Sequence, residues 1–86
     1  MQSDLETLRR VIDETARRSP VGYKLQDVEL EPASSDDGDE YLRVMIRLKG
    51  TEEADYPALQ RLIEAIENKV GELDERYPSV RFPDAA

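Results

Sequence analysis

The chain has 86 residues, of which 38% are hydrophobic and 37% charged, and its 20 acidic and 12 basic residues give a net charge of −8. A chain of this length fits one domain with a small core. Its negative charge repels phosphate backbones and anionic lipid, so we expect neither nucleic acid nor a membrane as a partner. Because the apolar fraction is small, we expect a homodimer in which two copies share apolar surface.

The sequence contains no cysteine and no histidine. Disulfides, thiolate metal sites and cysteine nucleophiles are therefore excluded. The longest apolar runs are far shorter than a membrane span, and the segment 1–6 lacks a basic region followed by an apolar run. We therefore expect no secretory signal and a cytoplasmic protein.

The first predicted element is a helix over about residues 4–18. Ser3 and Glu6 form a capping-box pattern. Apolar residues then recur on one helical face, at Leu5, Leu8, Val11, Ile12 and Ala16. Acidic residues precede arginines by four positions in the pairs Glu6–Arg10, Asp13–Arg17 and Glu14–Arg18. This order favours ion pairs along a solvated helix face, and Ser19-Pro20 ends the helix.

Two strands are predicted next, over about residues 21–32 and 40–49. The second alternates strictly between apolar and polar residues, which is typical of a half-buried strand. The first changes phase, and a β-bulge at Gln26-Asp27 restores one apolar face. This bulge predicts the pairs Tyr23–Leu48, Leu25–Ile46, Val28–Val44, Leu30–Leu42 and, on the outer face, Glu29–Arg43.

The second helix is predicted over about residues 56–77. Apolar residues recur at steps of three and four, namely Tyr56, Leu59, Ile63, Ile66, Val70, Leu73 and Tyr77. Two interpretations stay open: a helix packed on the sheet, which the extra Leu62 favours, and a seam shared with a partner helix. Gly71 is unfavourable inside a helix, which indicates a close approach by another backbone. Pro78 ends the helix, and a short edge strand follows over 79–82.

This order of elements predicts a single α+β domain over residues 1–86. We expect a two-layer sandwich in the order helix-strand-strand-helix-strand, with both helices on one face of an antiparallel three-stranded sheet and the last strand beside the first. The opposite face of the sheet would carry Glu29, Glu31, Tyr41, Arg43, Met45 and Arg47. This face is either solvated or the dimer surface.

Chemistry-bearing patterns are few. The segment 33–39 is predicted to be an exposed hairpin loop, and the candidate metal ligands in and beside it are Asp36, Asp37, Asp39 and Glu40. Their spacing differs from a calcium-binding EF-hand loop, and we interpret them as a solvated turn. Glu52, Glu53 and Asp55 form a second acidic cluster, of the kind that a helix N-terminus favours.

Catalysis would need a carboxylate base, since no histidine activates any of the five serines. We therefore expect no catalytic residue and no cofactor. Tyr23, Tyr56 and Tyr77 fall on core phases and are predicted to pack in the core, whereas Tyr41 is predicted to be partly exposed.

The run from Val21 to Phe82 resembles the cytoplasmic C-terminal domain of cation diffusion facilitator transporters. The shared features are the order of elements, a helix that breaks at Arg76-Tyr77-Pro78, and the short strand Val80-Arg81-Phe82. The resemblance implies a ferredoxin-like fold and a tendency to dimerise. In that family the domain binds metal largely through histidines, and because this sequence has none, metal sensing is carried over to no residue.

The leading hypothesis is a small homodimeric protein-interaction or regulatory module without catalytic activity, with a larger protein as a further possible partner. The predicted interaction surface consists of Tyr41, Arg43, Met45, Arg47, Val70 and Leu73. Two alternatives stay open: a ligand-binding or metal-binding regulatory domain that uses the acidic loop, and a carboxylate-based enzyme.

Overall fold

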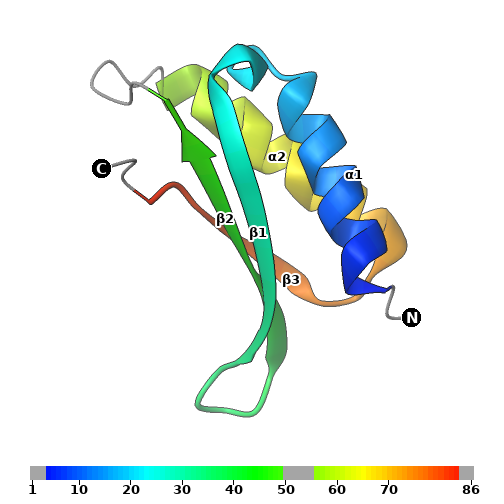
Figure 1. The fold of residues 1–86 in the computed structure, drawn as a ribbon. Helices are drawn as coiled ribbons and strands as arrows, with labels where there is room; N and C mark the ends of the chain where they lie inside the picture. Colours follow the sequence, from blue (N-terminus) through cyan, green and yellow to red (C-terminus); the bar gives the residue numbers. More distant parts are fainter. Residues whose placement is uncertain (1–3, 50–55, 84–86) are drawn as a thin grey trace.

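A computed structural model describes residues 4–49 and 56–83. Its elements in chain order are α1 (Leu5–Arg17), the short 3-10 helix η1 (Gly22–Lys24), β1 (Leu25–Ser34), β2 (Glu40–Leu48), α2 (Tyr56–Leu73) and β3 (Tyr77–Arg81). Figure 1 shows α1 and α2 lying side by side on one face of the three-stranded sheet. The predicted α+β class, its two layers and its order of elements are confirmed.

The predicted pairing of the last strand is wrong. The strand order is β1-β2-β3, and β3 runs parallel to β2 instead of antiparallel beside β1, so the sheet is mixed. Proline has no N–H to donate to a neighbouring strand and is confined largely to edge strands. Pro32 therefore makes β1 a poor central strand and β2 a better one. The inner side chains of β2, from Leu42 to Leu48, are all buried, as expected for the centre of the sheet.

The β-bulge between β1 and β2 is confirmed, because the register shifts between Leu25 and Asp27. The predicted partners, however, are displaced by two residues. Val28 pairs with Ile46 and Leu30 pairs with Val44. The cause is the connecting loop.

The loop that joins β1 to β2 spans only residues 35–39, instead of the predicted 33–39. The Ser35 N–H donates to the Asp39 carbonyl oxygen, and the Gly38 N–H donates to the Ser35 carbonyl oxygen, both at 2.9 Å. Gly38 has φ of 87°, a conformation that favours glycine. A loop two residues shorter moves every strand pair by two positions, so Glu31, and not Glu29, lies opposite Arg43.

The N-terminal part of the predicted first strand is not extended. Val21 is buried, and the next three residues form η1. The strand therefore begins at Leu25, which pairs with Leu48 in the place that was predicted for Tyr23.

Helix α1 begins one residue after Asp4, its N-cap. Leu8, Ile12 and Ala16 form its buried face. The capping box was predicted with Ser3 as the N-cap; Ser3 lies outside the described residues, and the N-cap of the described helix is Asp4, one residue later. The pair Asp13–Arg17 is confirmed, whereas Glu6 pairs with Arg9 at 2.9 Å and not with Arg10. The hydrogen bond from Arg9 lowers the pKa of the Glu6 carboxyl. Glu14 and Arg18, although both described, form no ion pair.

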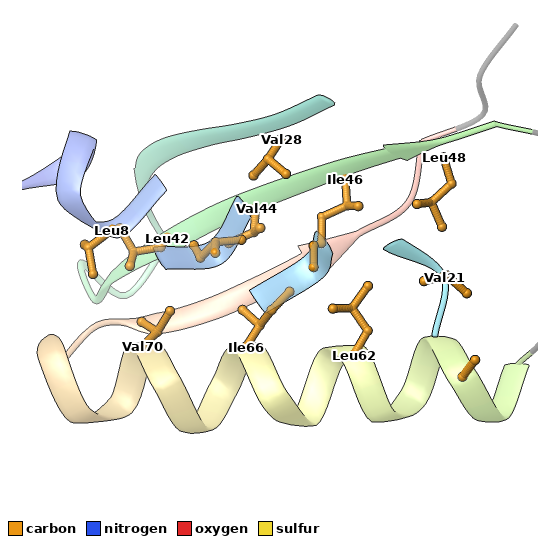
Figure 2. Packing of buried hydrophobic residues seen from close by; sticks show 13 residues of the cluster. Leu8, Val21, Val28, Leu42, Val44, Ile46, Leu48, Leu62, Ile66 and Val70 are labelled. Atoms are coloured by element: carbon orange, nitrogen blue, oxygen red, sulfur yellow. The ribbon is translucent and has the colours of Figure 1, made fainter. Parts of the chain in front are cut away.

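Helix α2 packs on the sheet through a line of side chains at steps of four, namely Ala58, Leu62, Ile66 and Val70. Figure 2 shows Leu62, Ile66 and Val70 directed toward the sheet, where Leu42, Val44 and Ile46 lie. The interpretation as a sheet-packed helix is confirmed, because Leu62 is buried. Of the predicted seam, Ile66 and Val70 are buried within the single chain, whereas Tyr56 and Leu73 are exposed, and the seam shared with a partner helix stays a prediction.

Helix α2 ends at Leu73, four residues earlier than predicted. The Asp74 carboxylate, which is fully buried, accepts hydrogen bonds from the backbone N–H and from the guanidinium of Arg76, all at 2.9 Å. These bonds turn the chain out of the helix and into β3 at Tyr77. They also raise the pKa of the Arg76 guanidinium, and the nearby carboxylates of Glu40 and Glu75 act in the same direction.

Candidate interaction surface

The face of the sheet opposite the helices is the first candidate surface, here named the outer sheet face. It consists of Asp27, Glu29, Glu31 and Ala33 from β1, Tyr41, Arg43, Met45 and Arg47 from β2, and Tyr77, Ser79 and Arg81 from β3. These side chains alternate with the buried ones along each strand. No described helix covers this face, and the four residues from β2 are half-buried.

Charge is ordered across the outer sheet face. The β1 row is acidic and the β2 row is basic. Arg43 lies 3.7 Å from Glu31, and Arg47 lies 3.8 Å from Glu29. The side chains of both pairs are 40% to 55% exposed, so each pair contributes at most about 1 kcal/mol to stability. The hydrogen bond between the Arg43 guanidinium and the Tyr41 hydroxyl, at 3.5 Å, raises the pKa of Arg43.

Tyrosine exposure differs from the prediction at three positions. Tyr23, Tyr56 and Tyr77 are 82%, 76% and 62% exposed, so their predicted packing role is wrong. Tyr23 belongs to η1 and Tyr56 is the first residue of α2. Tyr77 begins β3 on the outer sheet face, directly opposite Tyr41. Tyr41 is half-buried, which agrees with its prediction.

The six residues of the predicted interaction surface separate into three places. Tyr41, Arg43, Met45 and Arg47 lie together on the outer sheet face. Val70 is 0% exposed and packs against the sheet within a single chain, so its assignment to an interaction surface is wrong. Leu73 is 36% exposed and lies between the two helices, on their far side from the sheet.

A groove of about 580 Å³ runs between α1 and α2, and is here named the helix groove. Its lining is Val11, Glu14, Thr15, Arg18, Ser19 and Pro20 from the first helix and its end, and Arg61, Leu62, Ala65, Lys69, Glu72 and Leu73 from α2. Sequence reasoning missed this groove. The available signal was the set of small or apolar residues beside the buried line of α2, of which Ala65 is one.

The candidate metal ligands do not gather. Asp36, Asp37, Asp39 and Glu40 are all exposed, and no group of three acidic side chains among residues 4–49 and 56–83 is placed to hold a metal ion. The Ser35 hydroxyl instead accepts a hydrogen bond from the Asp39 N–H at 3.2 Å, which supports a structural turn. The acidic residues 52, 53 and 55 lie outside the described residues.

The serine hydroxyls serve local structure. The Ser19 hydroxyl donates to the Ala16 carbonyl oxygen at 2.6 Å, as part of the end of α1. Neither this contact nor that of Ser35 activates a nucleophile. In the described part of the chain, neither helix has the length and hydropathy needed to cross a membrane.

Comparison with known proteins finds no matching protein family and no matching curated protein. Solved structures do match. The putative zinc transporter CzrB is 14% identical with a TM-score of 0.60, over 94% of this chain and 92% of that one. A variant of MamM is 19% identical with a TM-score of 0.53, over 94% and 99% of the two chains. The copper form of the MamM C-terminal domain is 15% identical with a TM-score of 0.53, over 95% and 89%.

The match extends over nearly all of this chain and most of each matched chain. The resemblance that was inferred from the order of elements and the break before β3 is therefore confirmed at the level of structure. The chain has the fold of the cytoplasmic C-terminal domain of cation diffusion facilitator transporters.

Proposed function

We propose that this chain is a non-catalytic, homodimeric interaction module that acts in the cytoplasm and regulates a larger protein. The observation that carries the proposal is the order of charge on the outer sheet face, where an acidic row lies beside a basic row. The fold that the chain shares with transporter regulatory domains supports the same class of function.

The acidic row of one copy is complementary in charge to the basic row of a second copy when the two copies are related by a particular two-fold axis. A two-fold axis that runs parallel to the strands, between β1 and β2, places the β1 row of one copy over the β2 row of the other. Since Glu31 and Arg43 are direct neighbours in the sheet, Glu31 then faces Arg43 of the partner subunit. Asp27 faces Arg47 of the partner subunit by the same argument. A two-fold axis across the strands would instead place acidic row over acidic row, which is repulsive.

The same arrangement has an apolar centre. Met45 lies in the middle of the face, level with Glu29, and the aromatic pair Tyr41 and Tyr77 lies toward one end of it. Methionine and tyrosine are enriched in the centres of protein interfaces. The face covers only three short strands, so we expect a weak complex that weakens further with salt.

A charge-swap experiment tests this proposal directly. A chain with Arg43→Glu presents acidic side chains in both rows, and a chain with Glu31→Arg presents basic ones at the same level. Each variant alone should associate much more weakly than the unchanged chain, because both contacts between positions 31 and 43 across the axis become repulsive. An equimolar mixture should form a heterodimer in which both contacts are attractive again. Light scattering across a dilution series measures all three samples.

The matched control uses an ion pair on the solvated face of α1. Chains with Asp13→Arg and Arg17→Glu carry the same charge changes, and both should dimerise as the unchanged chain does. Urea unfolding verifies that every variant is folded. Dimers of unchanged stability in the two sheet variants, or a monomeric unchanged chain at millimolar concentration, would refute the proposed interface.

A further inference from the structure

The helix groove has an apolar floor with charged residues along its rim. Leu62 is buried at its base, and Val11 and Ala65 are half-buried beside it. Leu73 and Pro20, both exposed, extend the apolar lining toward the two ends. Small side chains such as Ala65 leave room between the helices, so the groove can receive apolar side chains from outside.

The rim of the helix groove carries three cations in a chain of net charge −8. Arg18, Arg61 and Lys69 are all exposed, and none of them forms an ion pair with another described residue. This contrasts with Arg9, Arg17, Arg43, Arg47 and Arg76, each of which is paired with a carboxylate.

The cations are not distributed evenly. Glu14 and Glu72 also line the groove and offset part of the positive charge. The two helices run in opposite directions, so the end of α1 lies beside the start of α2 (Figure 1). Arg18 and Arg61 therefore share one end of the groove, with Glu14 one helical turn away from Arg18, whereas Lys69 and Glu72 lie toward the other end.

The shape of the groove favours a helix as its occupant. Along α2 it extends from Arg61 to Leu73, which corresponds to about 18 Å, or three helical turns, at roughly 1.5 Å per residue. A partner strand has no equivalent site, since both edge strands carry a proline, Pro32 in β1 and Pro78 in β3. Proline interrupts the hydrogen bonds that strand addition requires.

We infer that the helix groove binds a short amphipathic helix of a partner protein, with leucine-like side chains on the apolar floor and acidic side chains over Arg18 and Arg61. A helix that lies in an apolar groove is a common mode of peptide recognition. The acidic residues give the partner its orientation, because two cations lie at one end of the groove, whereas at the other end Lys69 is accompanied by Glu72. This site lies on the opposite layer from the outer sheet face, so it does not require the proposed dimer.

The test uses a synthetic, fluorescein-labelled peptide of three helical turns. It carries leucine at every third or fourth position and glutamates concentrated near one end. A control peptide has lysine in place of every glutamate. Fluorescence anisotropy measures affinity, and two-dimensional NMR identifies the residues that contact the peptide. We expect saturable binding of the acidic peptide, with shifts at Thr15, Ala65 and Lys69.

Matched double variants separate the rim cations from overall charge. A chain with Arg18→Glu and Arg61→Glu should bind the acidic peptide at least about tenfold more weakly. A chain with Arg10→Glu and Lys49→Glu has the same net charge but alters two exposed cations outside both the groove and the outer sheet face, and it should bind as the unchanged chain does. Raising NaCl from about 50 to about 500 mM should weaken the binding of the unchanged chain.

Three results would overturn the inference. These are no saturable binding of the acidic peptide, equal binding of the lysine peptide, and an equal loss of affinity in both double variants. Groove shifts that depend on protein concentration without any peptide would identify a second copy of the chain as the occupant, which also overturns it. The charge-swap experiment on the outer sheet face is unaffected by any of these results, so the two proposals fail separately.

Discussion

The two faces of β2 differ in every property that matters for function. Its inward side chains, from Leu42 to Leu48, are at most 4% exposed and belong to the same hydrophobic core cluster as residues of both helices. Its outward side chains, from Tyr41 to Arg47, are half-buried. Two of these four are arginines and one is a tyrosine. One strand therefore supplies the stability of the domain and its candidate interface in alternate residues.

This difference indicates how such a small domain can change partners without losing its fold. Side chains on the inner face tolerate little substitution, because the core contains 13 buried hydrophobic residues among residues 4–49 and 56–83 and each supplies a large share of it. Side chains on the outer sheet face are held in register by the same backbone, and we expect them to contribute little to folding because their ion pairs are solvated. Unfolding and association measurements on matched pairs of variants, one on the inner face and one on the outer face of the sheet, test whether stability and dimerisation depend on different side chains.

The largest difference is expected between the buried ion pair and an exposed one. Asp74→Ala leaves the Arg76 guanidinium, whose side chain is only 10% exposed, without the carboxylate that binds it. Removing one partner of a buried ion pair costs about 3–5 kcal/mol of unfolding free energy. Glu31→Ala should cost less than about 1 kcal/mol, because its pair with Arg43 is solvated. Urea unfolding measures both values, and similar costs would contradict the separation.

The second comparison uses two neighbours in β2. Ile46→Ala creates a cavity at a position that is 0% exposed, with an expected cost of about 2–5 kcal/mol. Met45→Ala, one residue earlier on the half-buried face, should cost less than about 1 kcal/mol in dilute protein but should weaken dimerisation. Unfolding measured below and above the association range separates these effects. A large cost for Met45→Ala in the monomer would show that the outer sheet face is part of the fold.

Much of this architecture was predictable from residue periodicity. The alternation over 40–48 predicted β2 and its two faces, and the phase change at Gln26-Asp27 predicted the bulge. Such local patterns are sufficient where one face is buried, because a slip of one residue would expose the core.

The parts that were not predicted depend either on a few specific hydrogen bonds or on contacts between segments that are far apart in the sequence. The strand register depends on two hydrogen bonds within the loop 35–39, and the end of α2 depends on the contact of Asp74 with Arg76. The position of β3 beside β2 depends on which strand can lie at the edge of the sheet, and Pro32 favours the edge position for β1. The helix groove depends on the packing of two helices that are separate in sequence, so neither helix alone predicts it.

The third comparison, with the smallest expected maximum cost in unfolding free energy, uses two glycines in different surroundings, one packed against the end of α1 and one exposed on α2. A Cβ at Gly22 would overlap the carbonyl oxygen of Arg17 at the end of α1, so Gly22→Ala forces the backbone to move and should cost about 1–3 kcal/mol. A Cβ at Gly71 would meet no atom within 4 Å, and alanine is the better helix former. Gly71→Ala should therefore stabilise the monomer by up to about 1 kcal/mol.

The sequence predicted a close approach by another backbone at Gly71, and within the described residues of one chain no such approach exists. If Gly71→Ala stabilises the monomer and leaves association unchanged in light scattering, this part of α2 is plain solvated helix. If the same change raises monomer stability but weakens association, a second backbone must approach α2 at Gly71. The helix layer would then share in the association that we assign to the outer sheet face, and the separation between the two layers would fail.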